Sequence, residues 1–160
     1  MIDQFDAKIL NLVQQNNRLT VEQIGNQVGL SGSACQRRLG RLRDEKVIRG
    51  DVAVVDPARV GKMLTMIIDV TVERERPDVM IKFKNAMRAH PQVMQCYYVT
   101  GDKDFILVVC MRDMEEFEAF QTEFCTDNPM INRFSTSVVV DPVKVGLAVP
   151  VDTGDEKTRP

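Results

Sequence analysis

Three segments near the start of the chain carry apolar side chains at the spacing of an amphipathic helix. A buried stripe at this period is typical of helices that pack on one side. The apolar positions are Phe5, Ile9, Leu12 and Val13, then Val21, Ile24 and Val28, then Cys35, Leu39 and Leu42. The turn between the last two segments contains Gly29, and Ser31 or Ser33 is suited to cap the helix that follows. The pattern predicts a helix-turn-helix unit that projects one helix outward.

The third predicted helix is basic on the side opposite its apolar stripe. At about 100° per residue, Arg37 and Arg41 point away from the stripe, and Arg38 lies on one flank. A helix in the major groove needs this division, with hydrogen-bond donors facing phosphates and base edges. The alternative is that these arginines only form a solvated helix face. The residues expected to contact DNA are Ser31, Ser33, Gln36, Arg37, Arg38 and Arg41.

The distribution of charge along the chain supports a nucleic-acid partner at one end. The whole chain holds 21 basic and 23 acidic residues, a net charge of −2. Residues 1–50 hold eight Lys or Arg against five Asp or Glu, whereas residues 51–160 hold thirteen against eighteen. This asymmetry indicates a binding end and a non-binding end. We expect double-stranded DNA to meet only the first fifty residues.

After Ile48 the apolar period changes from that of helices to that of strands. Residues 49–55 are predicted to form a short strand that ends at Asp56-Pro57. Alternating apolar runs and two further amphipathic segments then follow. The four predicted strands are 64–72, 93–99, 105–111 and 131–140, and a Gly-Asp turn joins the second strand to the third. One predicted helix follows the first strand; Pro77 opens it, and Val79, Phe83, Ala86 and Met87 lie on one side. The other helix begins at Asp113 and follows the third strand. The order βαββαβ predicts a ferredoxin-like domain.

The predicted fold class is therefore α+β, in four parts. They are a helix-turn-helix (winged-helix-like) domain at 1–50, a strand and linker at 51–62, a ferredoxin-like domain at 63–150 and a polar, disordered tail at 151–160. The strand at 52–55 is apolar and would be an aggregation hazard if unpaired, so we expect it to pair with a second copy of the chain.

Composition narrows the class of protein further. A hydrophobic content of 44% with 28% charged residues is typical of a soluble globular protein, and no apolar run is long enough for a membrane span. No basic region followed by an apolar region opens the chain, so we expect no signal peptide. The four cysteines lie far apart, and His90, the single histidine, has no other metal-ligating residue near it in the sequence, so we expect no metal site. Cysteines that are not arranged in pairs also lead us to expect that the protein resides in the reducing cytoplasm. No nucleophile lies beside a base and no glycine-rich phosphate loop is present, which argues against an enzyme.

Several short motifs follow one another in an informative order. They are Asp6-x-x-Ile9-Leu10, Val28-Gly29-Leu30-Ser31, Cys35-x-Arg37-Arg38-Leu39-x-x-Leu42, Val47-Ile48-x-Gly50 and Thr100-Gly101-Asp102-x-Asp104. With these motifs in this order, the chain resembles the leucine-responsive and asparagine-responsive regulators, the Lrp/AsnC family. The resemblance covers residues 3–148. Gly40 departs from the more basic residue that some relatives show there. The resemblance implies a transcription regulator without a cofactor that forms dimers, often assembled into octamers, and senses a small molecule, commonly an amino acid.

The resemblance also implies where an effector binds, namely near the Gly-Asp hairpin loop and between subunits. When the family's roles are assigned to the matching positions of this sequence, Gly101 lets the ligand approach the backbone. Asp102 and Asp104 then meet its α-ammonium group. Thr100 and backbone amides meet the carboxylate. Thr136 and Ser137 add hydroxyls from a neighbouring subunit. The alternative is that Gly and Asp here only satisfy a hairpin turn.

A different function also remains compatible with these residues. A weakly specific, architectural protein that compacts DNA by oligomerisation needs the same basic helix and the same assembly surfaces. The ratio of affinities for specific and random DNA separates the two functions.

Overall fold

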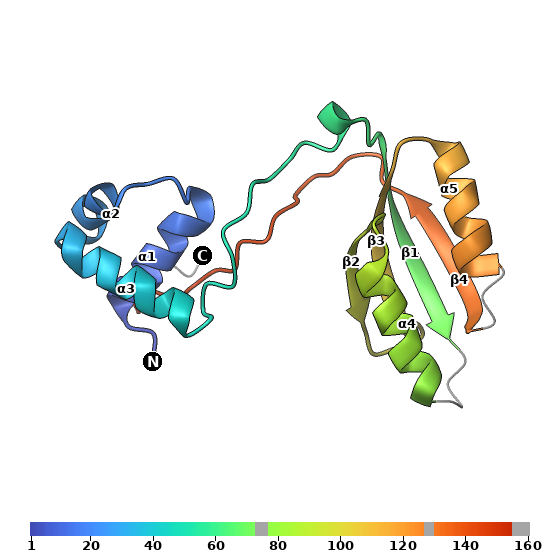
Figure 1. The fold of residues 1–160 in the computed structure, drawn as a ribbon, viewed down its shortest axis with the longest axis horizontal. Coiled ribbons are helices and arrows are strands. Elements are labelled where there is room, and N and C mark those ends of the chain that lie inside the picture. Colours follow the sequence, from blue (N-terminus) through green and yellow to red (C-terminus); the bar gives the residue numbers. More distant parts are fainter. Residues whose placement is uncertain (73–76, 127–129, 155–160) are drawn as a thin grey trace. The chain divides into compact units, whose positions relative to one another are not determined.

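The computed structural model describes residues 1–72, 77–126 and 130–154 (Figure 1). It contains two compact units, each with its own core. One unit holds Met1–Ala53 together with the segment that begins at Lys144, and the other holds Val54–Val143. No helix in the described ranges has the length and apolar character needed to cross a membrane.

The first unit consists of three helices, which confirms the helix-turn-helix prediction. They are α1 (Gln4–Gln15), α2 (Val21–Val28) and α3 (Gly32–Asp44). Each begins at a side-chain cap, which satisfies amide groups that the first helical turn leaves free. Asp3 and Thr20 form reciprocal capping boxes with Asp6 and Gln23, and Ser31 accepts a hydrogen bond from the Ala34 amide. The predicted apolar stripes meet in one core, made of Ile9, Leu10, Ile24, Val28, Cys35, Leu39 and Leu42.

The turn between α2 and α3 depends on two glycines. Gly29 ends α2 in the left-handed region, at φ 78°, where a residue without a side chain is favoured. Gly25 lies against the turn, and a Cβ atom there would sit 2.4 Å from the Leu30 carbonyl oxygen. The backbone of α2 therefore packs directly on the turn that sets the start of α3.

The second unit has the predicted βαββαβ order. Its strands are β1 (Leu64–Val72), β2 (Val93–Tyr98), β3 (Phe105–Met111) and β4 (Ile131–Val138), and its helices are α4 (Pro77–Ala89) and α5 (Met114–Phe120). A 3-10 turn at Ala58–Val60 precedes β1, and a wider helical turn, Gln121–Thr126, continues α5. The four strands form one antiparallel sheet in the order β2-β3-β1-β4.

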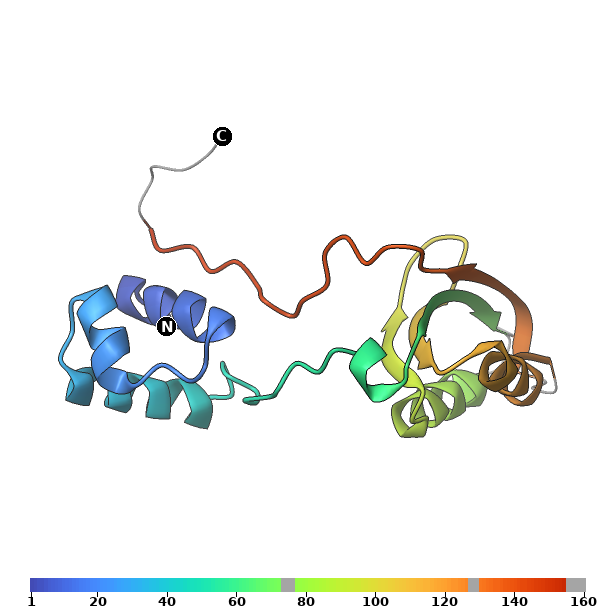
Figure 2. The same cartoon turned by 90° about the horizontal axis from the view of Figure 1, so that it is seen from above.

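The two helices of this unit cover one face of the sheet (Figure 2). Side chains alternate between faces along a strand, so Met66, Ile68 and Val70 of β1 lie in the core while Ile67 is 40% exposed on the other face. The helices contribute Phe83 and Met87 of α4 and Phe117, Phe120 and Phe124 from α5 and its continuation. Ala86, which the periodicity placed with the buried side of α4, is exposed.

The predicted strand at 49–55 is wrong for the single chain. Residues 51–55 have no regular structure, and Val52 and Val54 are 67% and 95% exposed. A strand needs a neighbour to accept its ladder of hydrogen bonds, and none of the described strands pairs with this segment.

The C-terminal segment also differs from its prediction. Residues 144–150, assigned by sequence to the second domain, belong to the helical unit. Val149 and Val151 are each held by two hydrogen bonds from α1, through Gln14 and Asn11. The tail is therefore held on α1 at Val151, while residues 155–160 of the predicted disordered segment lie outside the described residues.

Candidate nucleic-acid interface and ligand loop

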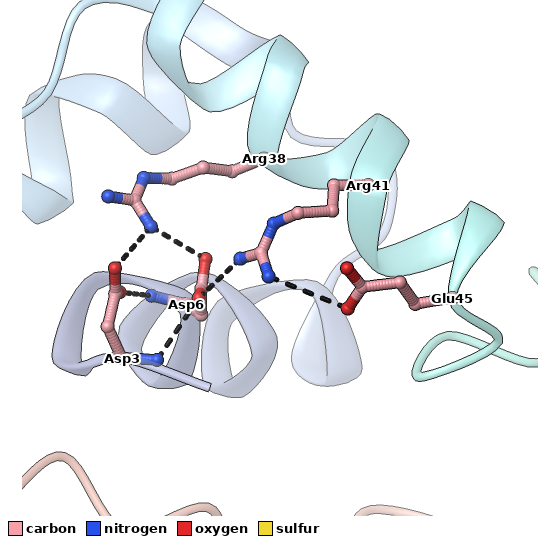
Figure 3. A network of polar contacts seen from close by, with 5 residues as sticks. All are labelled: Asp3, Asp6, Arg38, Arg41 and Glu45. Atoms are coloured by element: carbon pink, nitrogen blue, oxygen red, sulfur yellow. Dashed lines mark hydrogen bonds and ion pairs between the residues drawn. The ribbon is translucent and has the colours of Figure 1, made fainter. Parts of the chain in front are cut away.

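A cluster of charged side chains joins α1 to the basic helix α3 (Figure 3). The Asp6 side chain is fully buried and accepts hydrogen bonds from Arg38 Nη1 at 2.8 Å and Arg41 Nη2 at 2.5 Å. Arg38 also reaches Asp3 at 2.6 Å, and the Asp3 amide donates to Asp6 at 3.1 Å. One carboxylate of α1 therefore anchors two arginines of α3.

Protonation equilibria in this cluster favour the charged forms. Burial raises the pKa of Asp6, but the hydrogen bonds from Arg41, the Asp3 amide and Arg38 outweigh it and hold that pKa below its ordinary value. Hydrogen bonds to Asp3 and Asp6 raise the pKa of Arg38, and the bond to Asp6 raises that of Arg41. The cluster is therefore an ion pair network at neutral pH.

The structure corrects the predicted orientation of Arg41. This side chain was expected to point away from the apolar side of α3, yet it reaches back to α1 and to Glu45, 3.5 Å away. Helical rotation fixes the direction of Cβ, whereas a long arginine side chain bends toward the nearest uncompensated carboxylate. Arg37 behaves as predicted: it is exposed and forms no ion pair with the residues that the structure describes.

Three arginines nevertheless meet at one hollow in the surface of the helical unit. The hollow has a volume of about 330 Å³ and is lined by Arg37, Arg38 and Arg41 together with Met1 and Asp3. The side chains of Arg38 and Arg41 remain 24% and 35% exposed. Guanidinium groups in this arrangement are suited to grip a phosphate group.

The other predicted DNA contacts lie at the first turns of α3. Ser31 and Ser33 are exposed, with their hydroxyl oxygens 3.2 Å apart, and Gln36 is exposed one turn further on. The start of a helix also presents free amide groups and a partial positive charge. These polar groups are therefore available to a phosphate backbone or a base edge.

The Gly-Asp hairpin loop joins β2 to β3, and its residues divide into two groups. Thr100, Gly101 and Asp102 are exposed, and Gly101 adopts φ 113°, a conformation that favours glycine. Asp104 is 4% exposed, and its carboxylate accepts a hydrogen bond from the Val72 amide at 3.0 Å. This position corrects the prediction of an accessible carboxylate: Asp104 ties the loop to β1.

Thr136 and Ser137 lie on β4, two strands away from the hairpin. Thr136 pairs with the buried Ile68 and Ser137 with the half-exposed Ile67, so their side chains lie on opposite faces of the sheet. The Thr136 hydroxyl oxygen is buried and has no hydrogen-bond partner among the described residues. A single chain does not bring these hydroxyls to the hairpin loop.

The structural role of Asp6 was not predicted from the sequence. The available signal was a carboxylate three and four residues before Ile9 and Leu10, on the side of α1 that is buried. A buried charge requires a partner, and the nearest cations in the fold come from α3.

Across the described residues, no group of three or more His, Cys, Asp or Glu side chains is arranged to hold a metal ion.

Comparison with known families accounts for both units. Residues 2–43 match the model of the AsnC-type helix-turn-helix domain, and residues 65–149 match that of the Lrp/AsnC ligand binding domain. An uncharacterized HTH-type transcriptional regulator of Sinorhizobium fredii is 51% identical over 151 residues, which cover 94% of this chain and 89% of the relative. The leucine-responsive regulatory protein of Haemophilus influenzae is 33% identical over 143 residues, covering 89% and 86%.

Solved structures show the same architecture. The crystal structure of a Neisseria meningitidis transcriptional regulator in complex with L-Met has a TM-score of 0.88 and 30% identity, and the match covers 94% of this chain and 97% of that one. An AsnC family transcriptional regulator from Agrobacterium tumefaciens has a TM-score of 0.86 and 27% identity, with coverage of 92% and 96%.

Proposed function

The chain belongs to the Lrp/AsnC family of transcriptional regulators, and on that premise we propose that it binds specific DNA sequences through α3. The observation that carries this proposal is the hollow where Arg37 meets Arg38 and Arg41. Arg37 is free to read a base edge, while the two arginines held by Asp6 present fixed guanidinium groups to the backbone. The same proposal puts the site of action at the nucleoid, in the cytoplasm.

The direct test compares DNA affinities of matched arginine variants. Fluorescence anisotropy at fixed salt measures binding to the promoter region of the protein's own gene and to random DNA. Arg37→Ala should lose about 1–3 kcal/mol on the specific site and relax specificity, as expected for a base contact. Arg59→Ala is the control, because Arg59 is 87% exposed and lies outside the helical unit. It removes the same charge and should bind as the wild type does.

The same titration separates the regulator from an architectural protein. Equal affinity of the wild type for promoter and random DNA would favour architectural binding, in which the arginine hollow contacts phosphates only. Unchanged binding by Arg37→Ala on both DNAs would remove this face of α3 from the interface.

We also propose that an amino acid is the effector and that the exposed part of the hairpin loop contacts it. The support is the match to a ligand binding domain and the neighbouring structure with bound L-Met. In this chain Asp102 is the accessible carboxylate for an α-ammonium group, and Thr100 supplies a hydroxyl. A thermal-shift screen of the twenty amino acids tests the idea, since a ligand at 100 times its Kd adds about 2.7 kcal/mol to stability. Asp102→Ala should remove the response of the amino acid that the screen identifies.

Self-association completes the proposal. The face of the sheet that the helices leave open carries Ile67, and alternate residues of two extended segments are apolar and exposed. These residues are Val52 and Val54 in one segment and Val143, Val145, Leu147 and Val149 in the other. Unpaired apolar strands and an open sheet face are surfaces that proteins normally cover, and a second copy of the chain would cover both.

Light scattering of the full chain tests this association. Ile67→Glu should lower the measured mass, because a charge would be buried where two open sheet faces meet. Ile81→Glu on α4 is the matched control, since Ile81 is 63% exposed and lies away from the open face. Equal masses for wild type and Ile67→Glu would show that the open face is not the joining surface.

A further inference from the structure

The unit that contains the four-stranded sheet has a hollow of its own, where the edge strand β2 lies beside α4. Its volume is about 430 Å³, within the range of small-molecule sites. The wall from α4 consists of Lys84, Met87 and Arg88, spaced so that they share one helix face. The floor comes from β2 and β3, through Val93, Met94, Gln95, Cys96, Tyr98 and Phe105. None of the hairpin residues 100–104 lines it.

The charge of this hollow is of one sign. Lys84 and Arg88 are cationic, and no acidic residue stands among the described side chains that line it. Burial of its sulfur raises the pKa of Cys96, against the opposing effect of Arg88 and Lys84. The thiol is therefore neutral at pH 7 and adds no negative charge. No side chain of the lining therefore offers a negative charge to pair with an ammonium group.

Apart from Gln95 and the Cys96 thiol, the rest of the lining is apolar or aromatic. Phe105 is fully buried at the base, and Met87 is 2% exposed. Lys84 Nζ lies 4.3 Å from the centre of the Tyr98 ring, a cation–π contact that holds the ammonium group over the hollow. A ligand that fits these surfaces has an apolar body and an anionic end.

We propose that this hollow binds a small carboxylate with a branched or aromatic body and no ammonium group, such as a 2-oxo acid or an arylalkanoate. Its carboxylate would lie between Lys84 and Arg88, and its body would rest against Tyr98 and Met87. An amino acid of the same shape is disfavoured, because its ammonium group would lie beside two cations without an acidic partner. The site is distinct from the hairpin loop and goes beyond the amino-acid response proposed above.

The test uses ligands that differ only at the α-carbon. Calorimetric titration of the full chain compares 3-phenylpropanoate with L-phenylalanine, and 4-methyl-2-oxopentanoate with L-leucine. We expect at least one carboxylate to bind about fivefold more tightly than its amino-acid counterpart, the upper end for one charge interaction near the surface. Lys84→Ala/Arg88→Ala should weaken that binding by a similar factor. Lys82→Ala is the control, because Lys82 lies on the same helix, is 69% exposed and does not line the hollow.

Cys96 reports on the location of binding. The ligand that binds should slow alkylation of Cys96 by iodoacetamide, followed by peptide mass spectrometry, in wild type and Lys82→Ala but not in the double variant. Three results would overturn the proposal: no carboxylate binding up to about 10 mM, equal protection of Cys96 by the amino-acid partner, or equal protection of Cys96 in the double variant. None of these results depends on DNA binding, so the proposal stands or fails separately from the function of α3.

Discussion

Arg41 donates a hydrogen bond to the buried carboxylate of Asp6, 35 residues earlier in the chain, at 2.5 Å. The bond links the helix proposed to bind DNA to the first helix of the same unit. Arg38 binds the other oxygen of that carboxylate. The position of α3 relative to α1 therefore depends on one acidic residue, and two arginines proposed to contact DNA also stabilise the fold.

Asp6→Ala is expected to destabilise the protein by about 3 kcal/mol. This value is at the lower end for breaking a buried ion pair, because both arginines keep part of their surface in water. Urea unfolding followed by circular dichroism measures the change. Glu45→Ala removes the exposed partner of Arg41 and should cost less than about 1 kcal/mol. Equal stability of the two variants would contradict the anchoring role of Asp6.

The lowered pKa of Glu116 predicts how the free energy of unfolding changes at acid pH. Hydrogen bonds from Lys62, the Arg112 amide, Gln92 and the Arg112 side chain outweigh partial burial and lower the pKa of Glu116 from 4.5 to about 2. Because the folded pKa lies below the unfolded one, the stabilisation is fully present above about pH 4.5 and is lost as pH falls toward 2. Glu116→Gln should lower the unfolding free energy at pH 7, and the difference from wild type should shrink between pH 4.5 and 2.

Equilibrium unfolding at several pH values checks this expectation. Glu115→Gln removes an exposed carboxylate from the same helix and serves as the control. A difference between wild type and Glu116→Gln that stays constant from pH 7 to 2 would show that the carboxylate is not held by these contacts.

The sequence predicted the helices and the sheet well because their signals are local. Apolar periods and cap residues lie within a few positions of one another, so the start of α3 at Ser31 and the alternation of β1 follow from short windows. The segment at 49–55 ends in a run of apolar residues but pairs with none of the strands that the structure describes, and an apolar run alone does not supply a partner strand.

Long-range polar contacts were not predictable in the same way. The reach of Arg41 to Asp6 spans 35 residues, and the bond between Asp104 and the Val72 amide spans 32. Both depend on how separate elements pack and on the register of paired strands, which a single sequence does not specify. The arginine face was therefore predicted correctly for Arg37 and incorrectly for the orientation of Arg41.

The amide side chains of Asn11 and Gln14 should protect the C-terminal segment from exchange. Gln14 donates to the Val149 carbonyl at 2.9 Å and accepts from its amide at 2.7 Å, and Asn11 makes the equivalent pair with Val151. In Asn11→Ala/Gln14→Ala both amides lose their acceptor, so hydrogen exchange at Val149 and Val151 should become faster, by about tenfold or more. Gln15→Ala, an exposed change on the same helix, should leave exchange unaltered. Wild-type exchange rates in the double variant would mean that other contacts hold the segment.

Asp104→Ala is expected to act on stability, with a loss of about 1–3 kcal/mol. The substitution leaves the Val72 amide without its acceptor, and the cost of an unsatisfied buried donor sets the size of the loss. Asp104→Asn keeps an oxygen at the same position and should recover part of the stability. Asp102→Ala changes an exposed residue of the same loop and should leave stability within about 0.5 kcal/mol of wild type. Chemical denaturation of the three variants decides the matter: wild-type stability in Asp104→Ala would show that the carboxylate does not tie the hairpin to β1, and would make it available to a ligand again.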